Sequence, residues 1–292
     1  MRRLGRWWFA PAPPARLAAL RLLVGTFSLW YLWRRRRMFA RIAHTDPQLY
    51  APVGLARPFR RPLPPRVVQA SVDATLAANV AFVAGAGHRV TGPLYATLLL
   101  WTLSYRNSWS MVFHSDNLLA FHAIALGCSR SADALAIDAL RRPPARPEPR
   151  YGWPIQLMRT VTTLPYLLAG VAKVAGPLGW RWASGESLRR QVAIDGLRKE
   201  LLGSGAARAA FALYPHVELF RALAVGSLAV ELLAPASLVS RRASQAWALN
   251  AFAMHWGILA IMGIRFRYQL AGVAFAPFFA VERPLGAVRW VR

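Results

Sequence analysis

The sequence predicts an all-α fold, a polytopic transmembrane bundle of about eight spans with one additional helix at the membrane surface. Hydrophobic residues make up 55% of the 292 residues, and the mean hydropathy is positive at +0.28. Apolar runs that approach the roughly 17–25 residues needed to cross a bilayer recur along the whole chain. Arginines gather at the ends of these runs, where they would contact lipid headgroups.

The charge and the cysteine count exclude several classes of protein. A net charge of +25 would indicate a nucleic-acid partner in a soluble chain, but arginines such as Arg34 and Arg241 flank apolar runs. We therefore expect a lipid bilayer as the partner and no nucleic acid. Cys128 is the single cysteine, and the six histidines show no HExxH or paired spacing, so no disulfide or metal site is predicted.

Four spans are expected before a linker at residues 129–150, which ends in the proline–arginine run RRPPARPEPR. The first span begins at Pro14 and ends at four arginines without a cleavage pattern, so we interpret it as a retained span. The glycines of GAGHRVTGP predict a tight turn between the second and third spans. The expected ranges are 14–33, 67–86, 93–112 and 115–130.

Four further spans are expected at 153–175, 219–239, 245–264 and 268–281. Between the first two of these, residues 183–202 predict an amphipathic surface helix capped by Ser184. Its expected apolar face consists of Ala193, Ile194, Leu197 and Leu201. No internal repeat is visible, and we expect one domain over 1–292. A total of seven or nine spans is the alternative, because the third and eighth runs are short. The arginines are spread over both sides and do not decide the orientation.

The fifth span carries polar groups at helical spacing. They follow steps of three and four and are Gln156, Arg159, Thr163, Tyr166, Gly170 and Lys173. Residues at this spacing form one stripe on a helix. A polar stripe is unfavourable against lipid tails, so we expect it to face other helices or a wet cavity.

Lys173 is the most informative member of this stripe. Of the 37 basic residues only Lys173 and Lys199 are lysines. A lysine buried in apolar surroundings can lose its proton and act as a general base, whereas an arginine cannot. The alternative is that its long side chain snorkels to the membrane interface.

Several other ionisable residues also fall inside apolar runs, and they are Asp73, His122, Arg159, Glu231 and His255. A charge in the middle of a bilayer costs about 2.5–3.5 kcal/mol on insertion scales, so each needs a partner or a cavity. Internal pairing, for example of Glu231 with Arg159, is one interpretation. A functional pocket is the other. His114 and Asp116 lie at the mouth of the fourth span, where water could reach them; the alternative is that Ser115 or Asp116 caps the helix.

The order of motifs resembles the HTTM (horizontally transferred transmembrane) domain family, which is similar to the membrane part of vitamin K-dependent gamma-carboxylase. The motifs that carry the resemblance are LRLLVGTFSLW, SYRNSWSMVFHSDNLLAFHAIALG, ADALAID, LLAGVAKVAGPLGWRWASGESL, ELLAP and MHWGILAIMGIRF. The resemblance implies that Lys173 corresponds to the base that deprotonates reduced vitamin K and that His255 corresponds to the family's histidine in the seventh span.

One part of the chain departs from the carboxylase pattern. Where the carboxylase has Trp-Asn-Asn-His, this chain reads Trp109, Ser110, Met111 and Val112. His114 is two residues further on, and the carboxylase also has a large C-terminal soluble domain beyond its spans.

Two hypotheses follow from the residues and the resemblance. The first is a quinol-dependent or carboxylase-like enzyme of the bacterial cell membrane, with a reduced, vitamin K-like quinone as cofactor. Lys173 and His255 would be catalytic, and the pocket would be shaped by His114, Asp116, Arg159, Tyr166 and Glu231. The second is a non-catalytic membrane module that binds a lipid or quinone or serves as a subunit of a complex.

Overall fold

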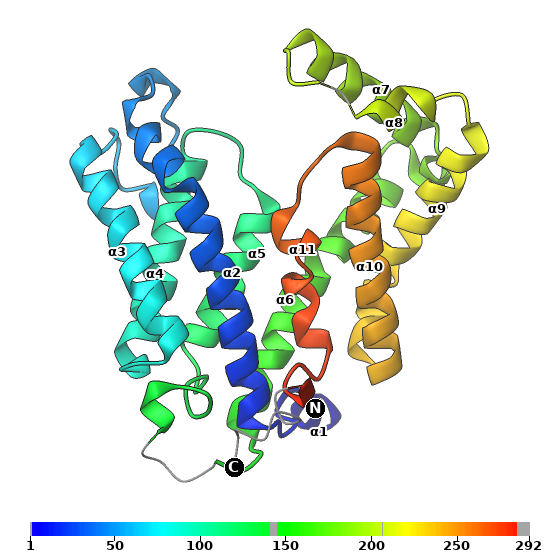
Figure 1. The fold of residues 1–292 in the computed structure, drawn as a ribbon. Coiled ribbons are helices and arrows are strands. Elements are labelled where there is room, and N and C mark those ends of the chain that lie inside the picture. The colour runs from blue at the N-terminus through cyan, green and yellow to red at the C-terminus, as the bar shows by residue number, and fades with distance from the viewer. Residues whose placement is uncertain (1, 141–144, 206, 285–292) are drawn as a thin grey trace. The chain divides into compact units, whose positions relative to one another are not determined.

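The computed structural model describes residues 2–140, 145–205 and 207–284, and their regular structure is helical without a β-strand (Figure 1). The predicted all-α class is confirmed. Contacts group the chain into two compact units, one reaching to Met158 and including residues from Ala280 on, the other Arg159–Phe279. The boundary falls inside one continuous helix, α6 (Pro149–Ala175), and the single domain over 1–292 stays a prediction.

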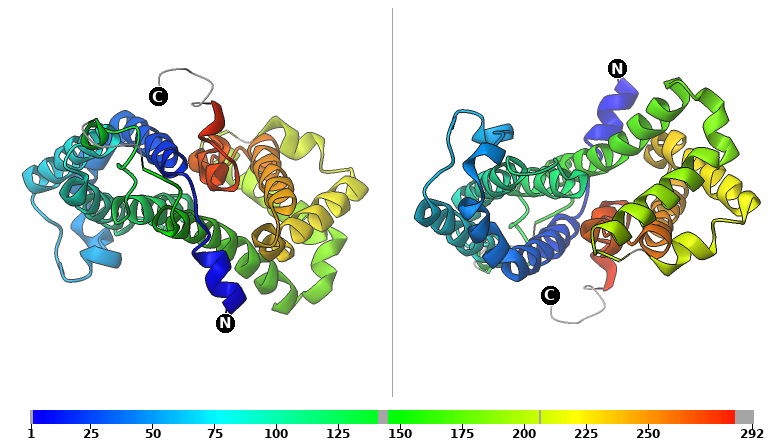
Figure 2. Two further views of the ribbon diagram at one scale, coloured as in Figure 1. Left: turned by 90° about the horizontal axis from the view of Figure 1, so that it is seen from below. Right: turned by 90° about the horizontal axis from the view of Figure 1, so that it is seen from above.

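The first unit is built on four helices that run side by side (Figures 1 and 2). They are α2 (Pro14–Arg41), α3 (Pro65–Ala84), α4 (His88–Asn107) and α5 (His114–Gly127). Helix α2 packs on α3 and α5, and α4 packs on the same two neighbours. The four helices therefore close into a bundle, preceded by the short helix α1 (Arg2–Trp8).

Two helices of this bundle differ from their predicted bounds. Helix α2 continues past residue 33 to Arg41, because arginine is a good helix former and nothing in the run interrupts the helix. Helix α4 begins at His88 rather than Pro93, since the Asp138 carboxylate accepts hydrogen bonds of 2.8 Å from the backbone N–H groups of both Gly87 and His88. That carboxylate satisfies donors that a helix start leaves unpaired.

Arg21 holds one end of the bundle together from its interior. Its side chain is completely buried, and its guanidinium donates to four backbone carbonyls. Two of these carbonyls, Phe82 and Val83, belong to the last turn of α3, where the helix dipole is negative. The other two, Ser131 and Leu135, belong to the loop after α5. One charged group thus ties α2 to α3 and to that loop.

The second unit continues from α6 through shorter elements. They are η5 (Gly179–Ser184), α7 (Glu186–Leu201), α8 (Arg208–Ala212), α9 (Val217–Leu232), η6 (Ala234–Leu238), α10 (Arg241–Met262), α11 (Arg267–Leu270) and η7 (Val273–Phe278). Helix α10 contacts α7, α8, α9, η6, α11 and η7, so it forms the centre of this unit.

The segment expected as an eighth span, 268–281, is not a continuous helix. It consists of the four-residue α11 and the six-residue 3₁₀ helix η7. Gly272 between them has a φ of +74°, which ends the first element, and Pro277 has no N–H to continue a helix.

The predicted surface helix forms as α7 (Glu186–Leu201), with its start corrected. Its N-cap is Gly185 with a φ of +81°, and Ser184 only accepts a 3.4 Å contact from the N–H of Glu186. Val192 and Gly196 are the buried residues. On the expected apolar face, Ile194, Leu197 and Leu201 are 65%, 55% and 87% exposed, and contact of this face with a membrane surface stays a prediction.

Two helical segments of the described chain are long and apolar enough to cross a membrane by length and composition, Pro14–His44 and Pro65–Ala84. Helices α5 and α9 have 14 and 16 residues, fewer than a straight crossing needs. Helices α4, α6 and α10 are long enough but carry arginines or other polar groups.

We predict that Arg21→Met destabilises the protein by about 3–5 kcal/mol, because it leaves buried carbonyls without their donors. Thermal unfolding in detergent, followed by circular dichroism, measures the effect. Arg34→Met is the matched control, since Arg34 is on the same helix but exposed, and it should change stability by less than about 0.5 kcal/mol. Equal melting temperatures for the two variants would contradict this role of Arg21.

Candidate functional site

The polar stripe of α6 faces the protein interior. Within the second unit Thr163, Tyr166 and Gly170 are buried, whereas Leu164 and Leu168 on the opposite face are 49% and 58% exposed. This pattern is the reverse of that on a helix of a water-soluble protein, where apolar residues face inward. The polar face of α6 therefore packs against other elements of the unit, as expected.

One end of the stripe binds backbone and hydroxyl groups. The Nε–H of Arg159 donates to the carbonyl of Pro277 at 2.8 Å. Thr163 Oγ1 donates to the Arg159 carbonyl at 2.8 Å and lies 3.2 Å from Ser237 Oγ. The suggested pairing of Arg159 with Glu231 is wrong, because Glu231 is bound by a different cation.

That cation is Lys173. Its ammonium donates to both carboxylate oxygens of Glu231 on α9, and it lies 4.6 Å from the centre of the Trp182 ring in η5. The side chain of Glu231 is 9% exposed and that of Lys173 is 25% exposed. The lysine thus ends in an ion pair that joins α6 to α9, with an aromatic face as a second cation contact.

Gly170, three residues before Lys173, allows α6 and α9 to approach closely. A Cβ atom at this position would lie 2.9 Å from Glu231 Cβ and 3.0 Å from Leu232 Cδ2. Such distances are shorter than van der Waals contact, so a larger residue would push α9 away. The glycine is what brings Glu231 within reach of Lys173.

Tyr166 and His255 form an aromatic cluster within the same unit. The Tyr166 ring packs edge-on against Trp247 at 5.1 Å and against His255 at 5.9 Å, and Phe275 lies 6.5 Å away. The Tyr166 hydroxyl is buried and has no hydrogen-bond partner among the described residues.

The tautomer of His255 follows from its one hydrogen bond. Nδ1 lies 2.8 Å from the carbonyl of Ala251. A carbonyl oxygen can only accept, so Nδ1 carries a proton, and in the neutral ring Nε2 then keeps a lone pair. His255 can therefore accept a proton or a hydrogen bond at Nε2.

His114 and Asp116 belong to the first unit, whereas the other five predicted site residues belong to the second. Asp116 is buried and accepts from Arg106 and, at 2.9 Å, from the Tyr31 hydroxyl. The N-cap of α5 is Phe113 without a side-chain cap, so the predicted capping role is wrong. His114 is exposed at the first position of α5.

The two remaining ionisable residues of the apolar runs each have a hydrogen-bond partner outside the groups described above. Asp73 is exposed and accepts a 2.8 Å hydrogen bond from Gln69 one turn away. His122 is completely buried, and its Nε2 lies 3.3 Å from the carbonyl of Met158. Neither residue belongs to the groups described above.

Sequence reasoning did not identify two residues of these groups. Trp182 lies within the motif LLAGVAKVAGPLGWRWASGESL, and its cation–π contact with Lys173 depends on how η5 folds back. Arg106 lies ten residues before Asp116 in the motif SYRNSWSMVFHSDNLLAFHAIALG, and their ion pair depends on the packing of α4 against α5.

Comparison with protein families identifies a known domain in part of the chain. A profile of the HTTM domain family matches residues 9–194, which is more than half of the chain. The chain belongs to the HTTM domain family. This is a family of transmembrane domains related to gamma-carboxylase, which implies association with a membrane. No curated protein and no solved structure matches the chain.

The family match covers only part of the candidate site. Lys173 and Trp182 lie inside residues 9–194, whereas Glu231 and His255 lie beyond them. The roles of all seven site residues therefore stay predictions. The ion pair itself joins the matched part of the chain to the part that follows it.

We predict that Gly170→Ala destabilises the second unit by about 1–3 kcal/mol through overpacking against α9. Gly257→Ala is the matched control, because Gly257 is also helical and a Cβ there would meet nothing within 4 Å. The control should be neutral or stabilising by about 0.5–1 kcal/mol, since alanine favours a helix. Chemical or thermal unfolding of both variants in detergent tests this, and an unchanged Gly170→Ala would refute the close approach.

Proposed function

We propose that the chain is a multi-pass protein embedded by about eight segments: the seven helices α2, α3, α4, α5, α6, α9 and α10, and the broken segment α11–η7. The distribution of side chains supports this embedding. Charged or polar groups such as Arg21, Asp116 and Glu231 are buried, while large apolar residues are exposed on the same helices. Water would favour the opposite distribution, and lipid favours this one.

The broken segment meets the requirement that a membrane places on irregular backbone. Non-helical backbone at membrane depth must be covered by protein and hydrogen-bonded. Ala274, Phe275 and Phe278 in η7 are buried, and Arg159 donates to the carbonyl of Pro277. The proposed role of Arg159 is therefore to satisfy this backbone.

We predict that cysteines placed at the exposed apolar positions Leu168, Val225 and Leu249 are protected from hydrophilic thiol reagents in membrane vesicles. The measurement uses a Cys128→Ser background, because Cys128 is the single cysteine of the chain. A cysteine at exposed Arg60, in a proline-rich loop, is the control and should react. Rapid labelling at Leu168, Val225 and Leu249 in intact vesicles would reject the multi-pass embedding.

Within this fold we propose a proton-transfer centre formed by Lys173, Glu231, Tyr166 and His255. The observation that carries the proposal is the buried Tyr166 hydroxyl, which lacks a hydrogen-bond partner among the described residues and is next to His255. A buried polar atom left unpaired costs about 1–3 kcal/mol, and a ligand oxygen would remove that cost. The surrounding rings of Trp247 and Phe275 would contact a flat, apolar ligand.

The residues therefore fit a reduced quinone, the class of cofactor that the family resemblance implies. Such a group would supply an acidic phenolic hydroxyl. Lys173 would take up a proton at Nζ after transferring its own to Glu231, because the ion pair allows a proton to pass from the ammonium to the carboxylate. Tyr166 would donate a hydrogen bond to the ligand, and His255 would accept one at Nε2.

Carboxylation does not follow from these residues. The position that holds the carboxylase histidine is Val112 here, and it is 43% exposed. His114 is also exposed at the start of α5. The proposed enzyme activity is therefore deprotonation of an acidic hydroxyl on a quinol-like ligand, in a protein that resembles the carboxylase membrane core.

The second candidate function is a non-catalytic module that binds a lipid or a quinone, or a subunit of a membrane complex. The observation that favours it is the Lys173–Glu231 pair itself, since an ammonium bound by both oxygens of a carboxylate is held in place as a cation. In this case the pair would only connect α6 with α9.

The two functions predict different behaviour of Lys173→Arg. If Lys173 transfers a proton, Lys173→Arg and Lys173→Ala should both abolish oxidation of the quinol by dioxygen supplied in the assay, with a loss of at least about 100-fold. The deprotonated quinol is the form that dioxygen oxidises, and arginine keeps its proton. If only a cation is needed, Lys173→Arg should bind ligand and melt like the unaltered protein. Purified variants are assayed for quinol oxidation and carbon dioxide incorporation.

Tyr166→Phe tests the ligand contact separately. It removes the hydroxyl and keeps the ring, so it should weaken quinone binding by about 5–10-fold while leaving protein stability unchanged or slightly higher. Absence of any quinol turnover by the unaltered protein, together with unchanged quinone affinity of Tyr166→Phe, would exclude the proposed centre.

A further inference from the structure

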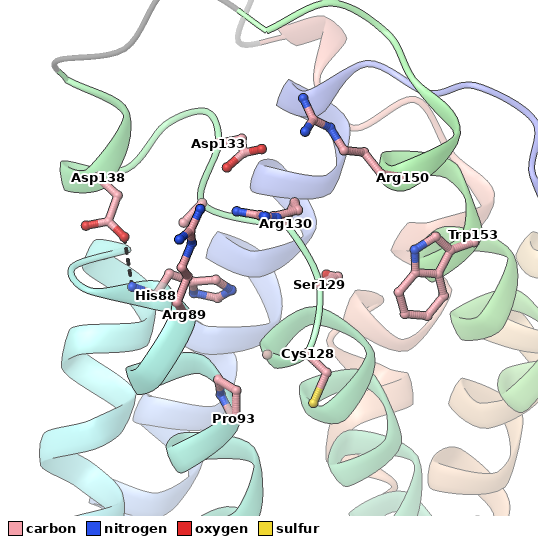
Figure 3. Close-up of a pocket in the computed structure, with 12 residues that line it drawn as sticks. His88, Arg89, Pro93, Cys128, Ser129, Arg130, Asp133, Asp138, Arg150 and Trp153 are labelled. Atoms are coloured by element: carbon pink, nitrogen blue, oxygen red, sulfur yellow. Dashed lines mark hydrogen bonds between the residues drawn. The ribbon is translucent and has the colours of Figure 1, made fainter.

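A cavity of about 460 Å³ opens at one end of the first unit (Figure 3). It is lined by the start of α4, the end of α5, the loop that follows α5, and the start of α6. Its volume is within the range of small-molecule sites. None of the seven predicted site residues lines it.

Three arginines from three different segments line this cavity: Arg89 on α4, Arg130 in the loop and Arg150 on α6. In Figure 3 their guanidinium groups lie in the upper half of the view, above Cys128 and Pro93. Arg89 and Arg130 are exposed and form no ion pair with any described residue. Arg150 has an exposed partner, Glu148, at 3.0 Å.

The two carboxylates of the cavity wall are already engaged by other donors. Asp138 accepts from the backbone N–H groups of Gly87 and His88 at 2.8 Å each. Asp133 accepts from the Tyr151 hydroxyl at 2.9 Å. These neutral donors leave both carboxylates charged but fix their oxygens, and the lining holds three arginines against two aspartates, so its formal charge remains positive.

A buried atom of the wall also lacks a partner. His88 is 5% exposed, and its Nε2 contacts Ser131 Oγ at 3.0 Å and the Leu126 carbonyl at 3.2 Å. Its Nδ1 is buried without a hydrogen-bond partner among the described residues. Because Nε2 faces a carbonyl oxygen and carries the ring proton, Nδ1 of the neutral ring is an acceptor. It would bind a donor such as a water molecule in the cavity, and it is not a ligand for an anion.

We propose that this cavity binds a negatively charged phosphate group, with Arg89 and Arg130 as its main ligands. Arginine is suited to this role because its planar group donates two parallel hydrogen bonds to phosphate oxygens. The ends of transmembrane helices lie at the depth of lipid headgroups, and basic pockets there bind anionic lipids. The headgroup of an anionic phospholipid and a soluble phosphate compound share this chemistry, and the first depends on the multi-pass embedding proposed above.

Cys128 provides an internal probe of the site. It lines the cavity, is exposed, and is the single cysteine of the chain, so thiol labelling reports on this place alone. The experiment compares an anionic with a cationic methanethiosulfonate reagent, each normalised to its rate with a small free thiol. We expect the anionic reagent to react faster by a factor on the order of 10, because the arginines concentrate anions.

The double substitution Arg89→Gln with Arg130→Gln should bring this ratio close to one. Its matched control, Arg60→Gln with Arg61→Gln, removes the same charge from exposed arginines of another loop and should keep the ratio. Lys173→Ala should keep it as well, which separates this site from the proton-transfer centre. An unchanged ratio in the double variant would overturn the proposal.

Protection of Cys128 from thiol labelling identifies the source of the phosphate group. In nanodiscs with about one third anionic phospholipid, labelling should slow several-fold relative to purely zwitterionic nanodiscs, and the double variant should lose this protection. Protection by inorganic phosphate in detergent, without protection by lipid, would support the site and assign a soluble ligand. If neither protects the unaltered protein, or if both protect the double variant equally, the site does not exist.

Discussion

Every charge inside an apolar helical chain needs a partner within the protein, because lipid supplies no hydrogen bonds. The structure meets this constraint in a different way in each unit. In the first, Arg21 is satisfied by four backbone carbonyls and Asp116 by Arg106 and Tyr31. In the second, Lys173 is satisfied by Glu231. Each of these contacts joins two different helices, or a helix and a loop, so the same groups that need partners also fix the packing.

This constraint explains which features the sequence could predict. Hydrophobic runs and flanking arginines gave the positions of most helices to within a few residues, because length and periodicity are local properties. The stripe on α6 was predictable for the same reason. The start of α4 was not, since it depends on Asp138, a residue fifty positions away in the chain. The break between α11 and η7 was signalled by Gly272 and Pro277, but the apolar composition of 268–281 outweighed them.

The partners of the buried charges could not be predicted either. Arg159 and Lys173 are both cations of the α6 stripe, and Glu231 could have bound either one. Glu231 pairs with Lys173 because α9 approaches α6 closely at Gly170, one turn before Lys173. This approach places Glu231 Cβ next to that part of α6. Arg159 instead donates a hydrogen bond to the carbonyl of Pro277. Spacing along one helix identifies its polar residues. Which of them forms an ion pair depends on where small residues let a second helix approach.

The same argument connects the lysine to its possible chemistry. An arginine in place of Lys173 could bind both oxygens of Glu231 equally well, so a purely structural link between α6 and α9 would not require a lysine. The chain uses arginine at 35 of its 37 basic positions, and the other lysine, Lys199, also pairs with a carboxylate, that of Asp195. Lys199 is on the surface helix α7, whereas Lys173 contacts an aromatic ring and a buried glutamate. For the proton transfer proposed above, lysine has the one property that arginine lacks, a proton that it can give up.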